Sequence, residues 1–391
     1  MRRRSRSPVA VEILRPFGQL FAFILITAVS LSSFLISLAF VMRGSNADQV
    51  LMEHMGQGLL GFTISNLPQV LVDGITIGFV YAAIALGYSM VYGVLEFINF
   101  AHSEIFAIGA FIGVEFLIAL DNGNRLAGAS IGQSYLFLGM AILGGMIIAG
   151  LAAVTVERVA YRPLRGAPRL VPLISAIGVS FFLVDAIRLI ESVTTGQFYR
   201  VFPTFGNFDQ IIELAHFNAL GFPVNLVIQV KSLVVILAAV TMMVGLSSFV
   251  NLSKIGKAIR AVAQDRPTAS LMGIDVNRII AITFLIGGAL GGAAGVLFAL
   301  KFTRIDPFMG FFPGLKAFTA AVLGGIGNLV GALLGGIVLG MLETAAGAYL
   351  SAFTAGAFGA EYKDIMAFAI LILVLIIRPH GLLGEQVSQK A

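Results

Sequence analysis

Long apolar segments recur along the whole chain, and they limit the folds it can adopt more than any other feature does. A helix needs about 20 apolar residues to cross the hydrocarbon core of a membrane. Runs near that length occupy Phe17–Met42, Leu67–Leu95, Ile105–Leu120, Tyr135–Val156, Val171–Ile190, Ser232–Val250, Ile279–Leu300, Leu329–Leu350 and Ile365–Ile377. Only 12% of the residues are charged, whereas soluble domains carry about 25%. The sequence therefore predicts an all-α, polytopic transmembrane helical bundle.

A shorter apolar run, Ala317–Leu323, differs from the others. It stops at the glycine-rich break Gly324–Asn328 and is too short to span a membrane alone. We expect a glycine-rich half-helix or the first leg of a hairpin. With this leg counted as a crossing, the chain has about nine or ten crossings.

The charges between the runs predict the orientation of the chain. Most of its 25 Lys and Arg residues fall in four segments, which are residues 1–15, 157–169, 251–278 and 378–391. Positive residues accumulate on the cytoplasmic side of membrane proteins. We therefore expect both termini to be cytoplasmic. The run Phe17–Met42 exceeds the about 7–15 apolar residues of a signal peptide, so we expect an uncleaved first helix.

Glycine is concentrated in two late segments at a spacing of four residues. These positions are Gly287, Gly291 and Gly295, then Gly327, Gly331 and Gly335. Residues four apart share a helix face, and glycine lets two helices approach closely. We expect these glycine faces to pack against other helices inside the protein. The alternative is that they form a smooth wall of a transport path, which must slide or reseal.

Motifs for chemistry are scarce. The chain has no Cys, no P-loop sequence and no H-E-x-x-H sequence, which argues against nucleotide hydrolysis and against a cofactor or metal of its own. The segment Gly128–Gly132 matches G-x-S-x-G, but it lies in a short loop between two spans, so we take the match as chance. No basic face for nucleic acid is found. Acidic residues near apolar runs are candidate functional groups, namely Asp73, Glu104, Glu115 and Glu343.

The connection Glu191–Asn225 is the longest expected on the external side. It interleaves aromatic and polar residues, with Phe198, Tyr199, Phe202, Phe205 and Phe208 as the aromatic positions. Such a length is unusual for a simple turn. The connection is expected either to anchor the protein at the membrane surface or to receive a partner.

The segment 251–278 has the pattern of an amphipathic helix pair. An apolar stripe at helical spacing is formed by Ile255, Ile259 and Val262. The opposite face carries Lys254, Lys257 and Arg260. Pro267 should end the first helix, and a second short one should end at Gly273. This pattern favours a docking site on the cytoplasmic face over a plain connecting loop.

Four ordered blocks of sequence carry a resemblance that covers most of the chain. They are Gly74–Phe111, Ala258–Leu297, Ala321–Glu343 and Ile377–Glu385. In this order they resemble the LivH-type permeases of branched-chain amino acid ABC transporters. The chain departs from the family pattern at Ser103, where glycine is usual, and in residues 1–66, an N-terminal extension with an extra transmembrane helix.

The resemblance implies a permease domain over 67–385 with a tail at 386–391, in a bacterial cytoplasmic (inner) membrane. It also implies the partners of such a permease: a second LivM-type permease, two cytoplasmic ATPase subunits and an extracytoplasmic substrate-binding protein. The chain would contact membrane lipid, would itself be no enzyme and would translocate branched-chain or other neutral amino acids. An importer of the same type for urea or short amides is the alternative, and a secondary transporter or channel that needs no ATPase is a further one.

The resemblance also assigns candidate residues. The residues that it assigns to ATPase coupling are Ile255, Lys257, Ile259, Arg260, Asp265 and Gly273. The residues that it assigns to the translocation path are Tyr88, Tyr92, Asn99, His102 and Ser103. Asn99 and His102 are three apart and could share a helix face. For His102, a hydrogen bond that holds a broken helix together is an equal alternative.

Overall fold

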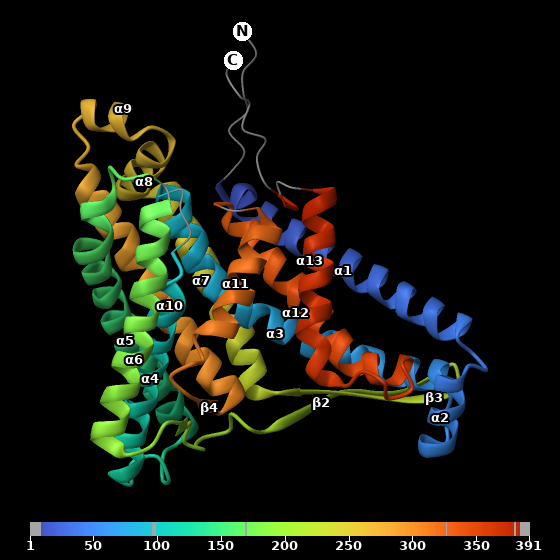
Figure 1. The fold of residues 1–391 in the computed structure, drawn as a ribbon. Coiled ribbons are helices and arrows are strands. Elements are labelled where there is room, and N and C mark those ends of the chain that lie inside the picture. Colours follow the sequence, from blue (N-terminus) through green and yellow to red (C-terminus); the bar gives the residue numbers. More distant parts are fainter. Residues whose placement is uncertain (1–8, 96–98, 169, 326, 379–380, 384–391) are drawn as a thin grey trace.

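The computed structural model describes residues 9–95, 99–168, 170–325, 327–378 and 381–383 (Figure 1). Its α-helices are α1 (Val9–Val41), α2 (Asn46–Met55), α3 (Leu59–Leu95), α4 (His102–Asn122), α5 (Ile131–Val156), α6 (Leu170–Thr195), α7 (Val230–Leu252), α8 (Lys254–Gln264), α9 (Arg266–Leu271), α10 (Val276–Phe302), α11 (Phe311–Gly324), α12 (Leu329–Phe353) and α13 (Lys363–Ile377). Short helical turns occupy Glu157–Tyr161, Arg162–Leu164 and Ala360–Tyr362. The strands are β1 (Arg200–Val201), β2 (Ile211–Ala219), β3 (Phe222–Gln229) and β4 (Arg304–Ile305).

Eight of the described helices are long and apolar enough to cross a membrane. They contain the expected runs except Ile365–Ile377, which lies in the 15-residue helix α13. The start of α1 and the end of α13 lie toward the end of the bundle that carries α8 and α9, here called the α8–α9 end (Figure 1). The fold is therefore a polytopic helical bundle, as predicted.

Helix α3 lies at the centre of the bundle and is 37 residues long. It packs against α12, α10 and α11, and α10 in turn packs against α4 and α5. Within α3, the segment from Phe79 to Leu86 is buried at every position. A central helix buried all round needs apolar or small side chains on every face, which explains its lack of amphipathic pattern.

The glycine faces pack inside the protein, as expected. A Cβ placed on Gly292 would lie 2.4 Å from the carbonyl oxygen of Gly145 in α5. One on Gly295 would lie 2.2 Å from the carbonyl oxygen of Phe106 in α4. Helix α12 uses Gly340 in the same way, 2.2 Å from the amide nitrogen of Gly78 in α3. Only glycine permits these helix separations.

The helix that contains the run Ala317–Leu323 is longer than that run. Helix α11 starts at Phe311 rather than at Ala317 and has 14 residues. It ends where Gly325 takes a φ of 104°, a conformation that favours glycine. The carbonyls at its end are satisfied by the later segment 381–383, because Leu382 and Leu383 donate their backbone N–H groups to Leu323 and Gly324 at 2.8 and 3.0 Å.

The prediction of an all-α fold was incomplete. Strands β2 and β3 form an antiparallel hairpin that pairs Ile211 with Gln229 at one end and Ala219 with Phe222 at the other, with a one-residue register shift between Glu213 and Ala215. Its turn residues Leu220 and Gly221 both have positive φ, as the tightest hairpin turns require. Strands β1 and β4 form a second, two-residue pair.

The long connection after α6 is anchored to the bundle rather than free. Phe202, Phe205 and Phe208 are buried, whereas Phe198 and Tyr199 are exposed. The first three rings pack in sequence, with centroids 5.9 and 5.2 Å apart. The N-terminal extension also contains more than the predicted single helix, because α2 follows α1 and α3 begins at Leu59.

Candidate functional site

The predicted path residues gather at the break between α3 and α4. Tyr88 and His102 are buried, and their rings meet edge to face with centroids 4.6 Å apart. The imidazole occupies space left by glycine, since a Cβ on Gly87 would lie 2.4 Å from its Nε2 atom. The site of His102 is thus a packed one in this conformation.

The other path residues make local contacts. The Tyr161 hydroxyl donates a 2.6 Å hydrogen bond to Asn99 Oδ1, which ties the break to the turn after α5. Ser103 is buried and donates to the carbonyl oxygen of Phe100 at 2.6 Å. Tyr92 is only half-buried. The structure therefore groups Tyr88, His102 and Ser103 near the start of α4, with Asn99 bonded toward α5.

Four of the predicted coupling residues lie on α8, whereas Asp265 precedes α9 and Gly273 follows it. Both helices stand at one end of the bundle (Figure 1). Ile259 and Val262 are buried against the bundle, whereas Ile255 is 40% exposed. Lys257 and Arg260 are exposed. The apolar stripe therefore holds α8 to its own chain, and the face open to a partner is the charged one.

The turn between α8 and α9 is built by Asp265. Its carboxylate accepts hydrogen bonds from the backbone N–H and the hydroxyl of Thr268, at 3.0 and 2.6 Å, and so caps α9. Gly273 follows α9 with a φ of 81°, where glycine is favoured. These two residues set the ends of the short helix; the end near Gly273 was predicted, whereas the cap formed by Asp265 was not.

We expect α9 to keep its cap at neutral pH and to lose it only in strong acid. The hydrogen bonds from Thr268 lower the pKa of Asp265. A carboxyl with a lowered pKa stabilises the folded form above its unfolded pKa and loses this effect as pH falls through the folded value. The protection factors of the α9 amides, which are corrected for the intrinsic pH dependence of hydrogen exchange, should therefore be higher at pH 7 than below the ordinary aspartate range. An Asp265→Ala variant should have low protection factors at both, and protection equal to that of the wild-type protein at pH 7 would contradict the role of the cap.

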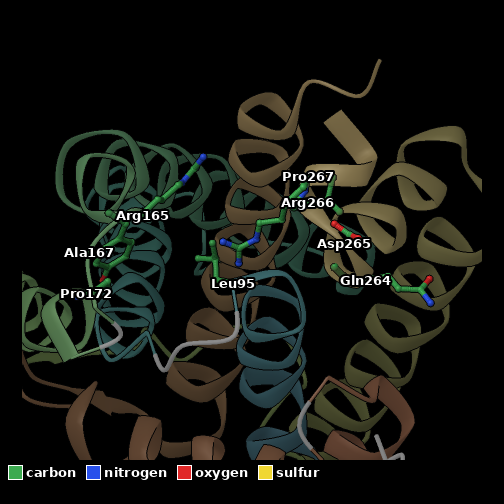
Figure 2. A pocket seen from close by; sticks show the side chains of 11 residues that line it. Leu95, Arg165, Ala167, Pro172, Gln264, Asp265, Arg266 and Pro267 are labelled. Atoms are coloured by element: carbon green, nitrogen blue, oxygen red, sulfur yellow. The ribbon is translucent and has the colours of Figure 1, made fainter. Parts of the chain in front are cut away.

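A pocket of about 400 Å³ lies between α9, the end of α3 and the start of α6. Figure 2 shows Arg266 reaching across it to Leu95, while Gln264 points away. The Arg266 guanidinium donates a 2.8 Å hydrogen bond to the carbonyl oxygen of Val94, in the last turn of α3. This carbonyl has no partner within its helix, and a cation is favourable there. Arg266 thus links α9 directly to the central helix α3.

Sequence reasoning missed a buried ion cluster between α3, α11, α12 and α13. Lys316 Nζ lies 2.8 Å from Glu343 Oε1 and 2.8 Å from Asp364 Oδ1. Tyr81 donates a 2.8 Å hydrogen bond to Glu343 Oε2, and Lys363 Nζ lies 3.3 Å from the other oxygen. Glu343 had been a candidate, but nothing in the sequence identified its partners. The charges pair with one another across these helices, and removal of one partner would leave a buried charge without its counter-charge.

Two more candidate acids also have structural partners. The buried Glu104 accepts 3.2 Å hydrogen bonds from Ser103 and Ser180. Glu115 pairs with Arg200 at 2.5 Å, and Arg200 also contacts Glu191 at 3.0 Å. These contacts tie β1 to α4 and α6. The geometry as a whole defines a polytopic helical membrane protein with a long central helix, α3, and a pair of short helices, α8 and α9, at one end.

Comparison with known proteins gives the family. Residues 70–375 match the family described as the permease component of the branched-chain amino acid transport system. The chain is 42% identical over 322 residues to the high-affinity branched-chain amino acid transport system permease protein BraD of Pseudomonas aeruginosa, covering 82% of this chain and 97% of that protein. It is 40% identical over 323 residues to the corresponding LivH protein of Escherichia coli K12, with the same coverage of 82% and 97%. The chain belongs to this family of permease components.

A more distant similarity is local. The ribose import permease protein RbsC of Haemophilus influenzae is 28% identical over 134 residues, which cover 33% of this chain and 39% of that protein. The family match begins at residue 70, so α1, α2 and the first turns of α3 lie outside it. The N-terminal extension noted in the sequence is thus outside the matched region.

Proposed function

We propose that this chain is the translocation subunit of an ATP-binding-cassette importer for branched-chain or other neutral amino acids. The supporting observation is its identity of 40–42% to high-affinity branched-chain amino acid permeases over 97% of their length. The eight helices able to span a membrane agree with this role. The names of these relatives favour amino acids over the alternative cargo of urea or short amides.

The partners belong to this proposal. They are a second permease of the LivM type, two cytoplasmic ATPase subunits and an external substrate-binding protein, in a bacterial inner membrane. The exposed side chains of Lys257, Arg260 and Asp265 form the face offered to an ATPase. Arg266 carries its movement to α3 through the hydrogen bond to Val94. The α8–α9 end is then cytoplasmic, together with both chain termini.

Translocation in this proposal passes the break between α3 and α4. The polar groups there are Tyr88, Tyr92, Asn99, His102 and Ser103, which stand among residues of α10 and α11. Movement of α3 relative to α10 would open this packed region. Gly87 in α3 and Gly291 in α10 lie against the His102 ring. Because glycine has no side chain, the two helices can pack closely again after such a movement.

Uptake into vesicles tests the proposal. Vesicles with this chain and the four partner subunits should accumulate leucine when ATP is supplied, and urea should neither be accumulated nor compete. Omission of this chain should abolish the uptake, and leucine uptake that persists would overturn the assignment. An Arg266→Met variant should retain ATPase binding but transport several-fold more slowly, because the link to Val94 is lost. Gln264→Met, whose side chain points away from the pocket, is the matched control (Figure 2).

A further inference from the structure

A second groove lies on the outside of the bundle between α5 and α10, away from the break and from the α9 pocket. Its volume is about 630 Å³. The lining has two parts, an apolar one formed by Leu151, Val154, Ala281, Ile282 and Leu285, and a polar one formed by Arg158, Arg162, Asp275, Asn277 and Arg278. The polar part lies at the end of α5 and the start of α10. The groove is thus charged at one end and apolar along its length.

The apolar part lies within the membrane. Both walls belong to segments able to span a bilayer, Ile131–Leu164 and Val276–Phe302. On α10, Arg278 and Leu285 are seven residues apart, which is about 10 Å along a helix. Leu151 is 54% and Leu285 39% exposed. Deeper still the helices meet, because a Cβ on Gly292 would lie 2.4 Å from the carbonyl oxygen of Gly145. The groove therefore runs from the membrane surface into the hydrocarbon and has a closed inner end.

The charged part has an excess of positive charge that the protein does not use. Arg158, Arg162 and Arg278 are exposed, and within the described ranges none of them forms an ion pair. Nearby Arg165 differs, because it pairs with Glu157 and donates to Asn277. The one carboxylate in the lining, Asp275, accepts a hydrogen bond from the Arg278 backbone N–H at 3.1 Å and caps α10. Three guanidinium groups thus face one carboxylate.

The geometry points to a binding site for one anionic phospholipid in this groove. The phosphate of the headgroup lies among Arg158, Arg162 and Arg278, and an acyl chain lies along the apolar part toward Leu285. Basic pockets between membrane helices bind such headgroups, whereas a soluble phosphate would gain nothing from the apolar part. The acidic surface of a soluble ATPase subunit would likewise leave the apolar part unfilled. The site does not depend on which solute the protein carries.

Lipid binding to the purified full-length chain tests this inference. Native mass spectrometry with phosphatidylglycerol, at rising concentration and against phosphatidylethanolamine, gives the affinity of each variant. Each of Arg158→Gln, Arg162→Gln and Arg278→Gln should weaken phosphatidylglycerol binding about five-fold, and the triple variant on the order of a hundred-fold. Lys254→Gln removes an exposed positive charge at the same end but outside the groove, and it should leave the affinity unchanged.

A second variant tests the apolar part without changing the charge. Ala281→Phe should fill the groove and weaken phosphatidylglycerol binding about as much as one arginine change. The size-exclusion profile and melting temperature of each variant report whether it is folded, and the single variants serve if the triple one is not. Three results would overturn the inference: an equal loss in Lys254→Gln, no loss in Ala281→Phe, or displacement of the lipid by glycerol 3-phosphate at similar concentration.

Discussion

Replacing Lys316 by methionine should destabilise the protein by about 3–5 kcal/mol, the usual cost of removing one partner from a buried ion pair. Its side chain is 9% exposed and that of Glu343 3%. Without Lys316, the Glu343 carboxylate keeps Tyr81 and the more exposed Lys363, but loses its buried cation. A fall in melting temperature of the purified protein in detergent measures the effect.

Two controls separate the buried charge from the loss of any lysine. Lys363→Met removes a cation whose side chain is 42% exposed, and it should cost less than about 1 kcal/mol. The double variant Lys316→Met, Glu343→Met removes both buried charges and should recover much of the stability. If the melting temperature of Lys316→Met equals that of the wild-type protein, the cluster does not hold α11 in place.

Replacing Gly292 by leucine should prevent correct packing of α10. A Cβ there would lie 2.4 Å from the Gly145 carbonyl oxygen and 2.6 Å from Ala149 Cβ. Overpacking costs about 1–3 kcal/mol in cores that can adjust, and backbone atoms adjust less than side chains. We expect a cost at or above the upper value, seen as loss of the monodisperse peak in size-exclusion chromatography.

Gly144 is the matched control for Gly292. It is in α5, next to Gly145, but nothing lies within 4 Å of a Cβ built there. Gly144→Leu should therefore elute as the wild-type protein does, and its melting temperature should be equal or higher, because leucine is the better helix former. Equal damage in both variants would mean that glycine content, rather than close helix contact, limits assembly.

The periodicity of the sequence predicted which residues share a helix face but not what covers that face. The spacing of Gly291 and Gly295 indicated close packing, yet α4 as their partner emerged only from the structure. The stripe of Ile259 and Val262 predicted α8 correctly, but the bundle covers it rather than a partner. Periodicity is a local property, whereas the identity of the neighbour depends on the whole fold.

Charge was the other source of error. Lys316 precedes the apolar run at Ala317, so hydropathy placed the start of the half-helix after it, whereas α11 begins at Phe311. A lysine is tolerated inside this helix because Glu343 and Asp364 neutralise it.

The hairpin β2–β3 was missed because its turn, Leu220–Gly221, lacks the common Asn-Gly or Asp-Gly pair.

The segment 381–383 matters for anyone who modifies this protein. Besides its two backbone hydrogen bonds to the end of α11, it accepts a 3.0 Å hydrogen bond from the Asn328 side chain at Leu383. A fluorescent reporter or affinity tag joined after Leu383 leaves all three bonds in place. A deletion that starts before Gly381 would expose the carbonyls of Leu323 and Gly324 and release Asn328, so shortened versions for crystallisation should retain these residues.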